Sequence, residues 1–219
     1  MKIAGFDKQS LIDYPGNITS VIFTQGCNFR CGFCHNPELV LPEKFTKTFS
    51  ENLILDYLAK HNKLLDAVCI TGGEPTLHSD LPVFIEKIKL LNLKVKLDSN
   101  GTNYSMLMYL IKENLIDFIA MDIKHILEYE KYNKIVGNYL SLQQYTEILK
   151  SIKLIEKSNI QYEFRTTIIK NMHTLQHIKD LKNRFQKNYK LQKFNPEKVL
   201  NRNIVMESYS EKEFNNILV

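Results

Sequence analysis

The chain has 219 residues, of which 44% are hydrophobic, and a formal net charge of +5, so it can bury one sizeable core and is expected to form a single domain over 1–219. Its lysines are scattered among amphipathic segments and form no dense basic run with interleaved aromatics, which argues against nucleic-acid binding. We find neither a signal-peptide pattern nor an apolar run near the roughly 18 residues of a membrane span, and we therefore expect a cytoplasmic protein without a membrane partner.

Short β-type segments alternate with amphipathic helical segments along the chain. The strands are expected at residues 19–24, 67–71, 93–97, 117–122, 162–168 and 189–194. This alternation predicts an α/β fold with a parallel sheet and helices outside it. A closed eight-stranded barrel typically takes about 250 residues, so six units predict a partial (β/α)6 TIM-like barrel with an open side.

The segments between and around these strands complete the expected organisation. Helical spacing of apolar residues follows three candidate N-caps, which are Asp80, Ser141 and Thr174. Residues 125–140 are expected to form a short helix and a loop. The expected divisions are an N-terminal extension over 1–17 that packs on the barrel, a partial barrel over 18–198, and a C-terminal tail with a short helix over 199–219.

Three of the four cysteines, Cys27, Cys31 and Cys34, fall within eight residues. A disulfide scaffold would distribute its cysteines, so this clustering indicates metal or cluster ligation in a reducing compartment. Three thiolates at this spacing can reach three corners of a cubane iron–sulfur cluster and leave one iron without a protein ligand. The alternative is a Cys3His zinc site with His35, which the adjacency of Cys34 and His35 disfavours because structural zinc ligands usually come in spaced pairs.

Polar and glycine-rich motifs follow the predicted strands at the ends where barrel folds place their chemistry. They are "TGGEPT" (71–76), "DSNG" (98–101) and "MDIK" (121–124). Each could be an ordinary turn or helix cap when taken alone. Their recurrence at successive strand ends favours a common site.

The chain resembles a known family over most of its length. "FTQGCNFRCGFCHNPEL" (23–39) followed by GGEP is similar to the radical S-adenosylmethionine (radical SAM) superfamily. More narrowly, these motifs together with "SLIDYPG" (10–16) and "LQKFNPEK" (191–198) resemble the activating enzymes of glycyl radical enzymes, and most of all those of anaerobic ribonucleoside-triphosphate reductase.

The resemblance implies a [4Fe-4S] cluster on Cys27, Cys31 and Cys34, with S-adenosylmethionine bound at the open iron. Transfer of one electron to the sulfonium would give methionine and a 5'-deoxyadenosyl radical, which would remove a hydrogen from a glycine of a partner enzyme. Activases with further clusters need about eight more cysteines, and this chain lacks them, so a separate flavodoxin or ferredoxin is the expected electron donor.

The resemblance also implies roles for the motifs at the strand ends. Gly72, Gly73 and Glu74 would bind the methionine amino group, and the backbone at Phe33 would meet the adenine. Asp98, Asp122 and Lys124 would surround the methionyl and ribose groups. Asp98, Ser99 and Asp122 could in addition hold a monovalent cation.

Two other functions are consistent with parts of the pattern. One is a radical SAM enzyme acting on a small molecule, as 7-carboxy-7-deazaguanine synthase does, against which "SLIDYPG" and CHNPE count by resemblance. The other is a non-catalytic zinc or iron–sulfur protein, against which "GGEP" and "DSNG" count because a carrier needs no methionine-binding groups.

For each of four further polar side chains, the sequence is consistent with two roles. Cys69 lies in mid-strand and is expected to be a buried small hydrophobe rather than a ligand. His125 and His173 lie near strand ends, where a substrate contact and a surface position are both consistent with the pattern. Arg165 could contact S-adenosylmethionine or form a structural ion pair.

Overall fold

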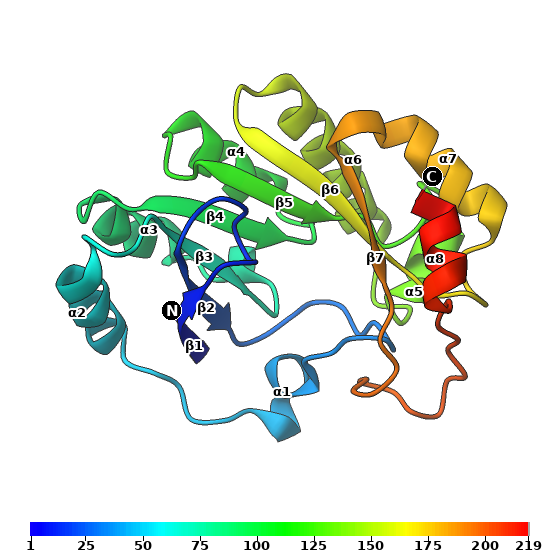
Figure 1. Ribbon diagram of the computed structural model, residues 1–219, viewed down its shortest axis with the longest axis horizontal. Coiled ribbons are helices and arrows are strands. Elements are labelled where there is room, and N and C mark those ends of the chain that lie inside the picture. The colour runs from blue at the N-terminus through cyan, green and yellow to red at the C-terminus, as the bar shows by residue number, and fades with distance from the viewer. Residues whose placement is uncertain (219) are drawn as a thin grey trace.

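The computed structural model describes residues 1–218 and centres on one curved sheet of seven strands (Figure 1). The strands are β1 (Ile3–Ser10), β2 (Thr19–Thr24), β3 (Ala67–Gly72), β4 (Lys94–Ser99), β5 (Phe118–Asp122), β6 (Gln161–Ile168) and β7 (Tyr189–Lys193). Their order in the sheet follows the chain, and β2 to β7 are all parallel. The predicted partial barrel of six parallel strands is confirmed.

Most of the helices lie between successive strands of the chain and flank the sheet (Figure 1). They are α1 (Pro37–Val40), α2 (Glu51–His61), α3 (Leu81–Lys89), α4 (Tyr104–Lys112), α5 (Tyr129–Ile135), α6 (Leu142–Lys157), α7 (Leu175–Phe185) and α8 (Glu211–Leu218). Ser141 and Thr174 form the capping boxes of α6 and α7. Asp80 makes no such cap, because its carboxylate pairs with the amino group of Met1 instead. Among residues 1–218, no helix combines the length and apolar character needed to cross a membrane.

The N-terminal strand β1 adds an antiparallel edge to the sheet by pairing with β2. The sequence did not indicate a strand here, because residues 3–10 lack a clean apolar alternation. The "SLIDYPG" loop (10–16) then leads into β2 at the end of the barrel where the parallel strands begin. In this loop Tyr14 is buried, and its ring centroid lies 5.4 Å from that of Phe118, the first residue of β5. The motif therefore closes the N-terminal end of the barrel.

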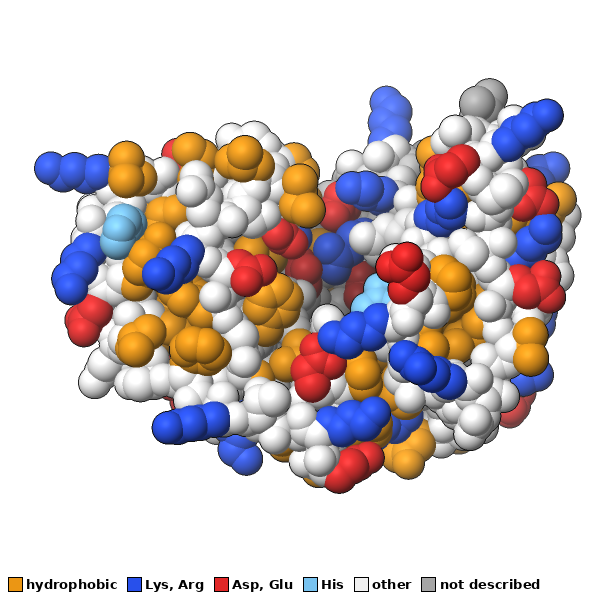
Figure 2. All heavy atoms as spheres, turned by 60° about the horizontal axis from the view of Figure 1, so that its bottom comes forward, with side chains coloured by type: hydrophobic (Ala, Val, Ile, Leu, Met, Phe, Trp, Pro, Cys, Tyr) orange, Lys and Arg blue, Asp and Glu red, His pale blue; other side chains and the backbone are white. Residues whose placement is uncertain are grey.

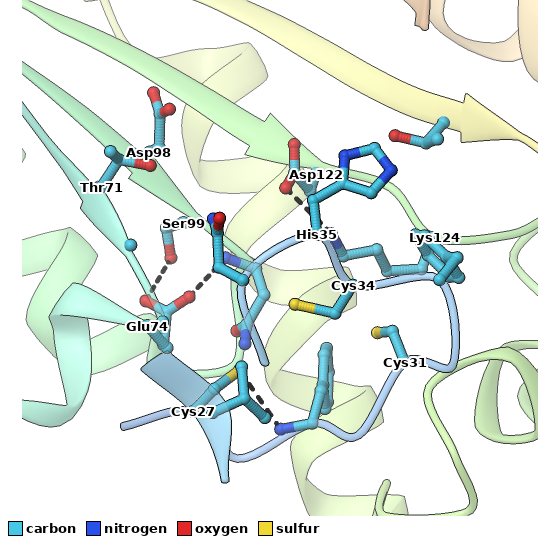
Figure 3. A pocket seen from close by; sticks show the side chains of 18 residues that line it. Cys27, Cys31, Cys34, His35, Thr71, Glu74, Asp98, Ser99, Asp122 and Lys124 are labelled. Atoms are coloured by element: carbon cyan, nitrogen blue, oxygen red, sulfur yellow. Dashed lines mark hydrogen bonds and ion pairs between the residues drawn. The ribbon is translucent and has the colours of Figure 1, made fainter. Parts of the chain in front are cut away.

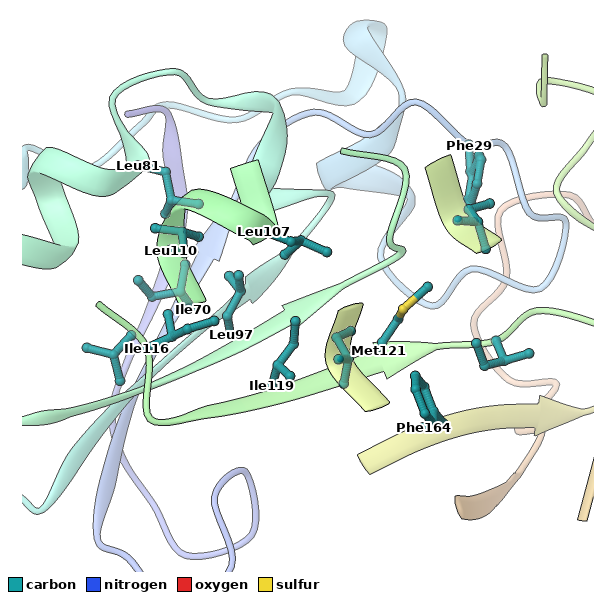
Figure 4. Packing of buried hydrophobic residues seen from close by; sticks show 14 of the residues in the cluster. Phe29, Ile70, Leu81, Leu97, Leu107, Leu110, Ile116, Ile119, Met121 and Phe164 are labelled. Atoms are coloured by element: carbon teal, nitrogen blue, oxygen red, sulfur yellow. The ribbon is translucent and has the colours of Figure 1, made fainter. Parts of the chain in front are cut away.

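The two faces of the sheet differ in chemistry because alternate side chains of a strand point to opposite faces. The outer face carries the apolar core between sheet and helices, which includes Ile70, Leu97, Ile119, Met121, Phe164, Leu81, Leu107 and Leu110 (Figure 4). The residues in the other phase are largely polar or charged, among them Lys96, Asp98, Asp122 and Arg165. Closed barrels usually fill this space with Val, Ile and Leu. Here charged side chains occupy much of the interior, which suits the binding of a polar ligand.

Candidate active site

A cavity opens where the parallel strands end, and every residue predicted for the site lines it. Its walls are formed by Cys27, Phe29, Cys31, Phe33, Cys34, His35, Asn36, Val40, Thr71, Gly72, Gly73, Glu74, Asp98, Ser99, Asn100, Asp122, Lys124 and Thr167. Figure 2 shows a hollow in the molecular surface with acidic and basic side chains inside it. In Figure 3 the three cysteine sulfurs lie across this space from the ends of β3, β4 and β5.

The cysteine loop is fixed by the loops that follow other strands. Asn28 donates from Nδ2 to Thr102 Oγ1 at 2.9 Å, and its Oδ1 accepts from Asn100 Nδ2 at 2.8 Å. On the other side, the backbone N–H of Arg30 donates to the Val136 carbonyl at 3.0 Å. The loop is thus held against the end of β4 and the segment after α5. The sequence analysis did not predict this role of Asn28, although a polar side chain next to Cys27 is a candidate for positioning the cysteine loop.

The three thiols are buried, and their raised pKa values mean that the thiolate forms need a nearby positive charge. Burial raises the pKa of Cys27 and of Cys31 to about 12, and it also raises the pKa of Cys34. Lys124 opposes this effect at all three thiols but does not overcome it. A thiolate becomes stable in such a place when metal ions supply the compensating charge. Three buried thiols on one cavity therefore fit the expected iron–sulfur cluster.

His35, the fourth ligand of the alternative zinc site, is engaged elsewhere. Its Nε2 lies 2.9 Å from the carbonyl oxygen of Asn195, and its ring stacks on Phe194 with centroids 6.1 Å apart. Within the part of the chain that the structure describes, no three His, Cys, Asp or Glu side chains form a group suited to a single metal ion. The imidazole of His35 thus joins the cysteine loop to the segment after β7.

The glycine pair after β3 allows two backbones to lie in direct contact. Gly72 has φ +118°, and a Cβ on Gly73 would clash with the carbonyl oxygen of Gly26. The N–H of Gly73 donates to Thr24 O at 2.9 Å, and that of Glu74 donates to Gly26 O at 2.7 Å. The resemblance implies that the two glycines contact the methionine amino group. In the structure, their closest approach is to the backbone that leads into the cysteine loop.

The carboxylate of Glu74 is buried and accepts four hydrogen bonds, three at Oε1 and one at Oε2. It accepts from the N–H and Oγ1 of Thr76 at 3.1 and 2.5 Å, from Ser99 Oγ at 2.9 Å and from the N–H of Asn100 at 2.7 Å. Burial raises the pKa of Glu74 above its ordinary value, and these donors lower it in part. The side chain joins the end of β3 to the end of β4 and also lines the cavity.

Glu74→Gln is expected to lower the free energy of unfolding by about 2 kcal/mol, because the amide NH2 group would face donors and leave buried hydrogen-bonding groups unpaired. Urea denaturation of the apoprotein measures the change. Glu86→Gln, at an exposed position on α3, is the matched control and is expected to have no measurable effect. An unchanged midpoint for Glu74→Gln would contradict the role of Glu74 as a structural link.

Asp98 and Asp122 line the cavity, and each forms ion pairs with two cationic side chains. Arg165 donates from Nε to Asp122 Oδ1 at 2.9 Å and from Nη1 to Asp98 Oδ2 at 3.3 Å. Lys124 Nζ lies 2.9 Å from Asp122 Oδ2, and Lys96 Nζ lies 2.7 Å from Asp98 Oδ1. Burial alone would raise the pKa of Asp122, but Arg165 and Lys124 hold it well below its ordinary value. Arg165 therefore forms structural ion pairs.

The two histidines that the sequence left open lie behind Lys124. Nδ1 of His173 accepts from the N–H of Ile169 at 3.1 Å, so its Nε2 carries the proton and donates to the Lys124 carbonyl at 3.1 Å. The ring of His125 stacks on that of His173 with centroids 4.8 Å apart. Burial lowers the pKa of both imidazoles to about 4. Both rings are therefore neutral at ordinary pH, and His173 supports the backbone at Lys124 while His125 Nε2 faces the Met172 carbonyl at 3.2 Å.

Comparison with known proteins places this geometry in a family. The radical SAM superfamily matches residues 21–185. A protein of Methanocaldococcus jannaschii, provisionally named a glycyl-radical enzyme activating enzyme, is 36% identical over 182 residues, which cover 82% of this chain and 73% of that protein. The pyruvate formate-lyase-activating enzyme of Clostridium pasteurianum is 27% identical over 158 residues, which cover 70% of this chain and 64% of that protein.

Solved structures share the fold at low sequence identity. SuiB of Streptococcus suis bound to S-adenosylmethionine is 16% identical, with a TM-score of 0.70 over 90% of this chain and 45% of that one. A radical SAM methyltransferase from Sphaerobacter thermophilus is 14% identical, with a TM-score of 0.68 over 93% of this chain and 63% of that one. The chain therefore belongs to the radical SAM superfamily and, within it, to the glycyl-radical enzyme activating enzymes.

Proposed function

We propose that the protein generates a glycyl radical on an anaerobic ribonucleotide reductase. The observation that supports this most is a single cavity that combines three buried cysteines with the charged ends of β4 and β5. The choice of partner rests on resemblance, through "SLIDYPG" and CHNPE. Tyr14 of the first motif packs on Phe118 and does not line the cavity.

In this proposal Cys27, Cys31 and Cys34 hold a [4Fe-4S] cluster. With S-adenosylmethionine on the fourth iron, the cluster would supply one electron from a flavodoxin or ferredoxin and yield methionine and a 5'-deoxyadenosyl radical. The protein itself binds and orients the cofactor. Its charged residues keep fixed positions through ion pairs, so little reorganisation is needed during the reaction.

The cofactor contacts belong to the same proposal. Glu74 and the backbone at Gly72 and Gly73 would bind the methionine amino group, and the backbone at Phe33 would meet the adenine. Lys124 Nζ lies 5.9 Å from the centroid of the Phe33 ring, so it can reach a carboxylate or a ribose hydroxyl in the same space. Asp98, Asp122 and Lys124 would surround the methionyl and ribose groups, and Asp98, Ser99 and Asp122 would in addition hold a monovalent cation.

The open side of the barrel would admit a loop of the partner. A glycine loop can enter in an extended form, because glycine adopts backbone conformations that other residues avoid and brings its Cα close to the 5' carbon. The radical would take one hydrogen atom from that Cα, giving 5'-deoxyadenosine and leaving the unpaired electron on the glycine. Docking would be transient, since the activase must leave once the radical is stored.

The test uses an anaerobic ribonucleotide reductase deuterated at the candidate glycine. Deuterium is expected in 5'-deoxyadenosine, with a glycyl radical in the electron paramagnetic resonance spectrum and about one S-adenosylmethionine consumed per radical. A partner with the target glycine replaced by alanine is the control. Cleavage over many turnovers with label transferred from a small metabolite, and with no protein radical, would instead support a small-molecule radical SAM enzyme.

A further inference from the structure

Lys96 is a buried cation beneath the cavity that the sequence did not single out. It lies on β4, in register with Cys69 of β3, and is only 2% exposed. Its Nζ lies 2.7 Å from Asp98 Oδ1 and 3.8 Å from Cys69 Sγ. Burying an ammonium group is costly, and replacing a buried ion pair by apolar side chains is often neutral or stabilising. Stability alone therefore does not explain a lysine at this position.

Lys96 is one end of a row of alternating charges across the barrel interior. The row runs from Lys96 through Asp98, Arg165 and Asp122 to Lys124, and each contact joins opposite charges. Asp98, Asp122 and Lys124 line the cavity, whereas Lys96 and Arg165 lie behind them. The two hidden cations thus act on the site through the carboxylates that they hold.

The two cations hold Asp98 unequally. Lys96 approaches one oxygen at 2.7 Å, whereas Arg165 approaches the other with two nitrogens, Nη1 and Nη2, both at 3.3 Å. Guanidinium groups pair with carboxylates most strongly in a bidentate arrangement that uses both oxygens. Without Lys96, Asp98 would be free to rotate into such a pair with Arg165. The Lys96 ammonium opposes this rotation because it donates a hydrogen bond to Oδ1.

We propose that Lys96 is a positioning residue that fixes the orientation of the Asp98 carboxylate for S-adenosylmethionine. This inference rests on the proposed function only as far as the binding of that cofactor, and it is independent of the partner enzyme. It assigns Lys96 no contact with the cofactor. Its effect passes through one hydrogen bond, from Nζ to Asp98 Oδ1.

The first test replaces Lys96 by methionine, which keeps the length and apolar stem of the side chain. The Kd for S-adenosylmethionine, measured by anaerobic calorimetry on the cluster-loaded protein without any partner, is expected to rise roughly 10-fold or more, as for the loss of a hydrogen bond to a charged group. The iron content is expected to stay unchanged. Lys94→Met, two residues earlier on the same strand and exposed, is the matched control and should keep the wild-type Kd. A wild-type Kd for Lys96→Met would overturn the proposal.

The second test separates positioning from simple support of the fold. Lys96→Ala leaves space beside Asp98, and added methylammonium is expected to restore most of the lost affinity, because it supplies a donor at the position of Nζ. Potassium ions at the same ionic strength are expected to restore little. Failure of methylammonium to improve binding, or equal rescue by potassium, would overturn the proposal. A loss of glycyl radical formation with normal cofactor binding would instead count against the proposed partner.

Discussion

Replacing any one of Cys27, Cys31 and Cys34 by alanine is expected to abolish assembly of the iron–sulfur cluster, whereas Cys69→Ala is expected to retain it. A cubane cluster is normally held by four thiolates, and this site supplies three, so the loss of one more leaves two irons without protein ligands. Cys69 is fully buried on β3 and does not line the cavity, so its thiol acts as a small interior group.

Anaerobic reconstitution with iron and sulfide measures this difference. Wild type and Cys69→Ala should each bind about four irons per chain and show the same absorption and reduced-state resonance spectra, as expected for a [4Fe-4S] centre. The other three variants should bind almost none while keeping wild-type circular dichroism as apoproteins. Stoichiometric zinc in protein purified without oxygen, or a full cluster in any of the three variants, would contradict the assignment.

The parallel part of the sheet could be predicted because its strands are short, apolar and separated by strong helical patterns. The expected segment 19–24 coincides with β2, and 162–168 differs from β6 by one residue. The strand β1 was missed because Gly5 and a run of polar residues hide its alternation, and only its pairing with β2 shows that it is a strand. Edge strands gain much of their stability from the neighbour, which a local pattern does not reveal.

The predicted site residues meet in one cavity because they follow strands that are parallel and adjacent, so their positions at strand ends determine their place in space. The side-chain contacts that hold these residues in place could not be predicted from the motifs. Asn28 meets Asn100 and Thr102 across more than 70 positions of the chain, and Lys96 meets Asp98 only because both point into the barrel. Glu74 is in the cavity wall, yet its oxygens are turned toward donors of the protein. Such details depend on side-chain direction, which a motif does not encode.

Asp122→Asn is expected to raise the Kd for S-adenosylmethionine by roughly 100-fold, because it removes the carboxylate that pairs with Lys124 and one of the two that pair with Arg165. Arg165 and Lys124 both pair with this carboxylate, at 2.9 Å each. The cofactor carries a sulfonium, and an uncompensated positive field would oppose its binding. The cluster should still assemble, since its three ligands are unchanged. Calorimetry with the cluster-loaded variant measures the affinity, and Asp56→Asn, exposed on α2, is the control.

The same substitution should also change how stability depends on pH. The folded-state pKa of Asp122 is depressed, so this carboxylate stabilises the protein above its unfolded pKa of about 3.9, and the contribution is lost as the pH falls through the folded value. Breaking a partly buried pair in this way is expected to cost about 3 kcal/mol at pH 7. Urea unfolding of wild type and Asp122→Asn should therefore differ most at neutral pH and converge in acid. Parallel curves across the pH range would show that Asp122 is not held ionised by Arg165 and Lys124.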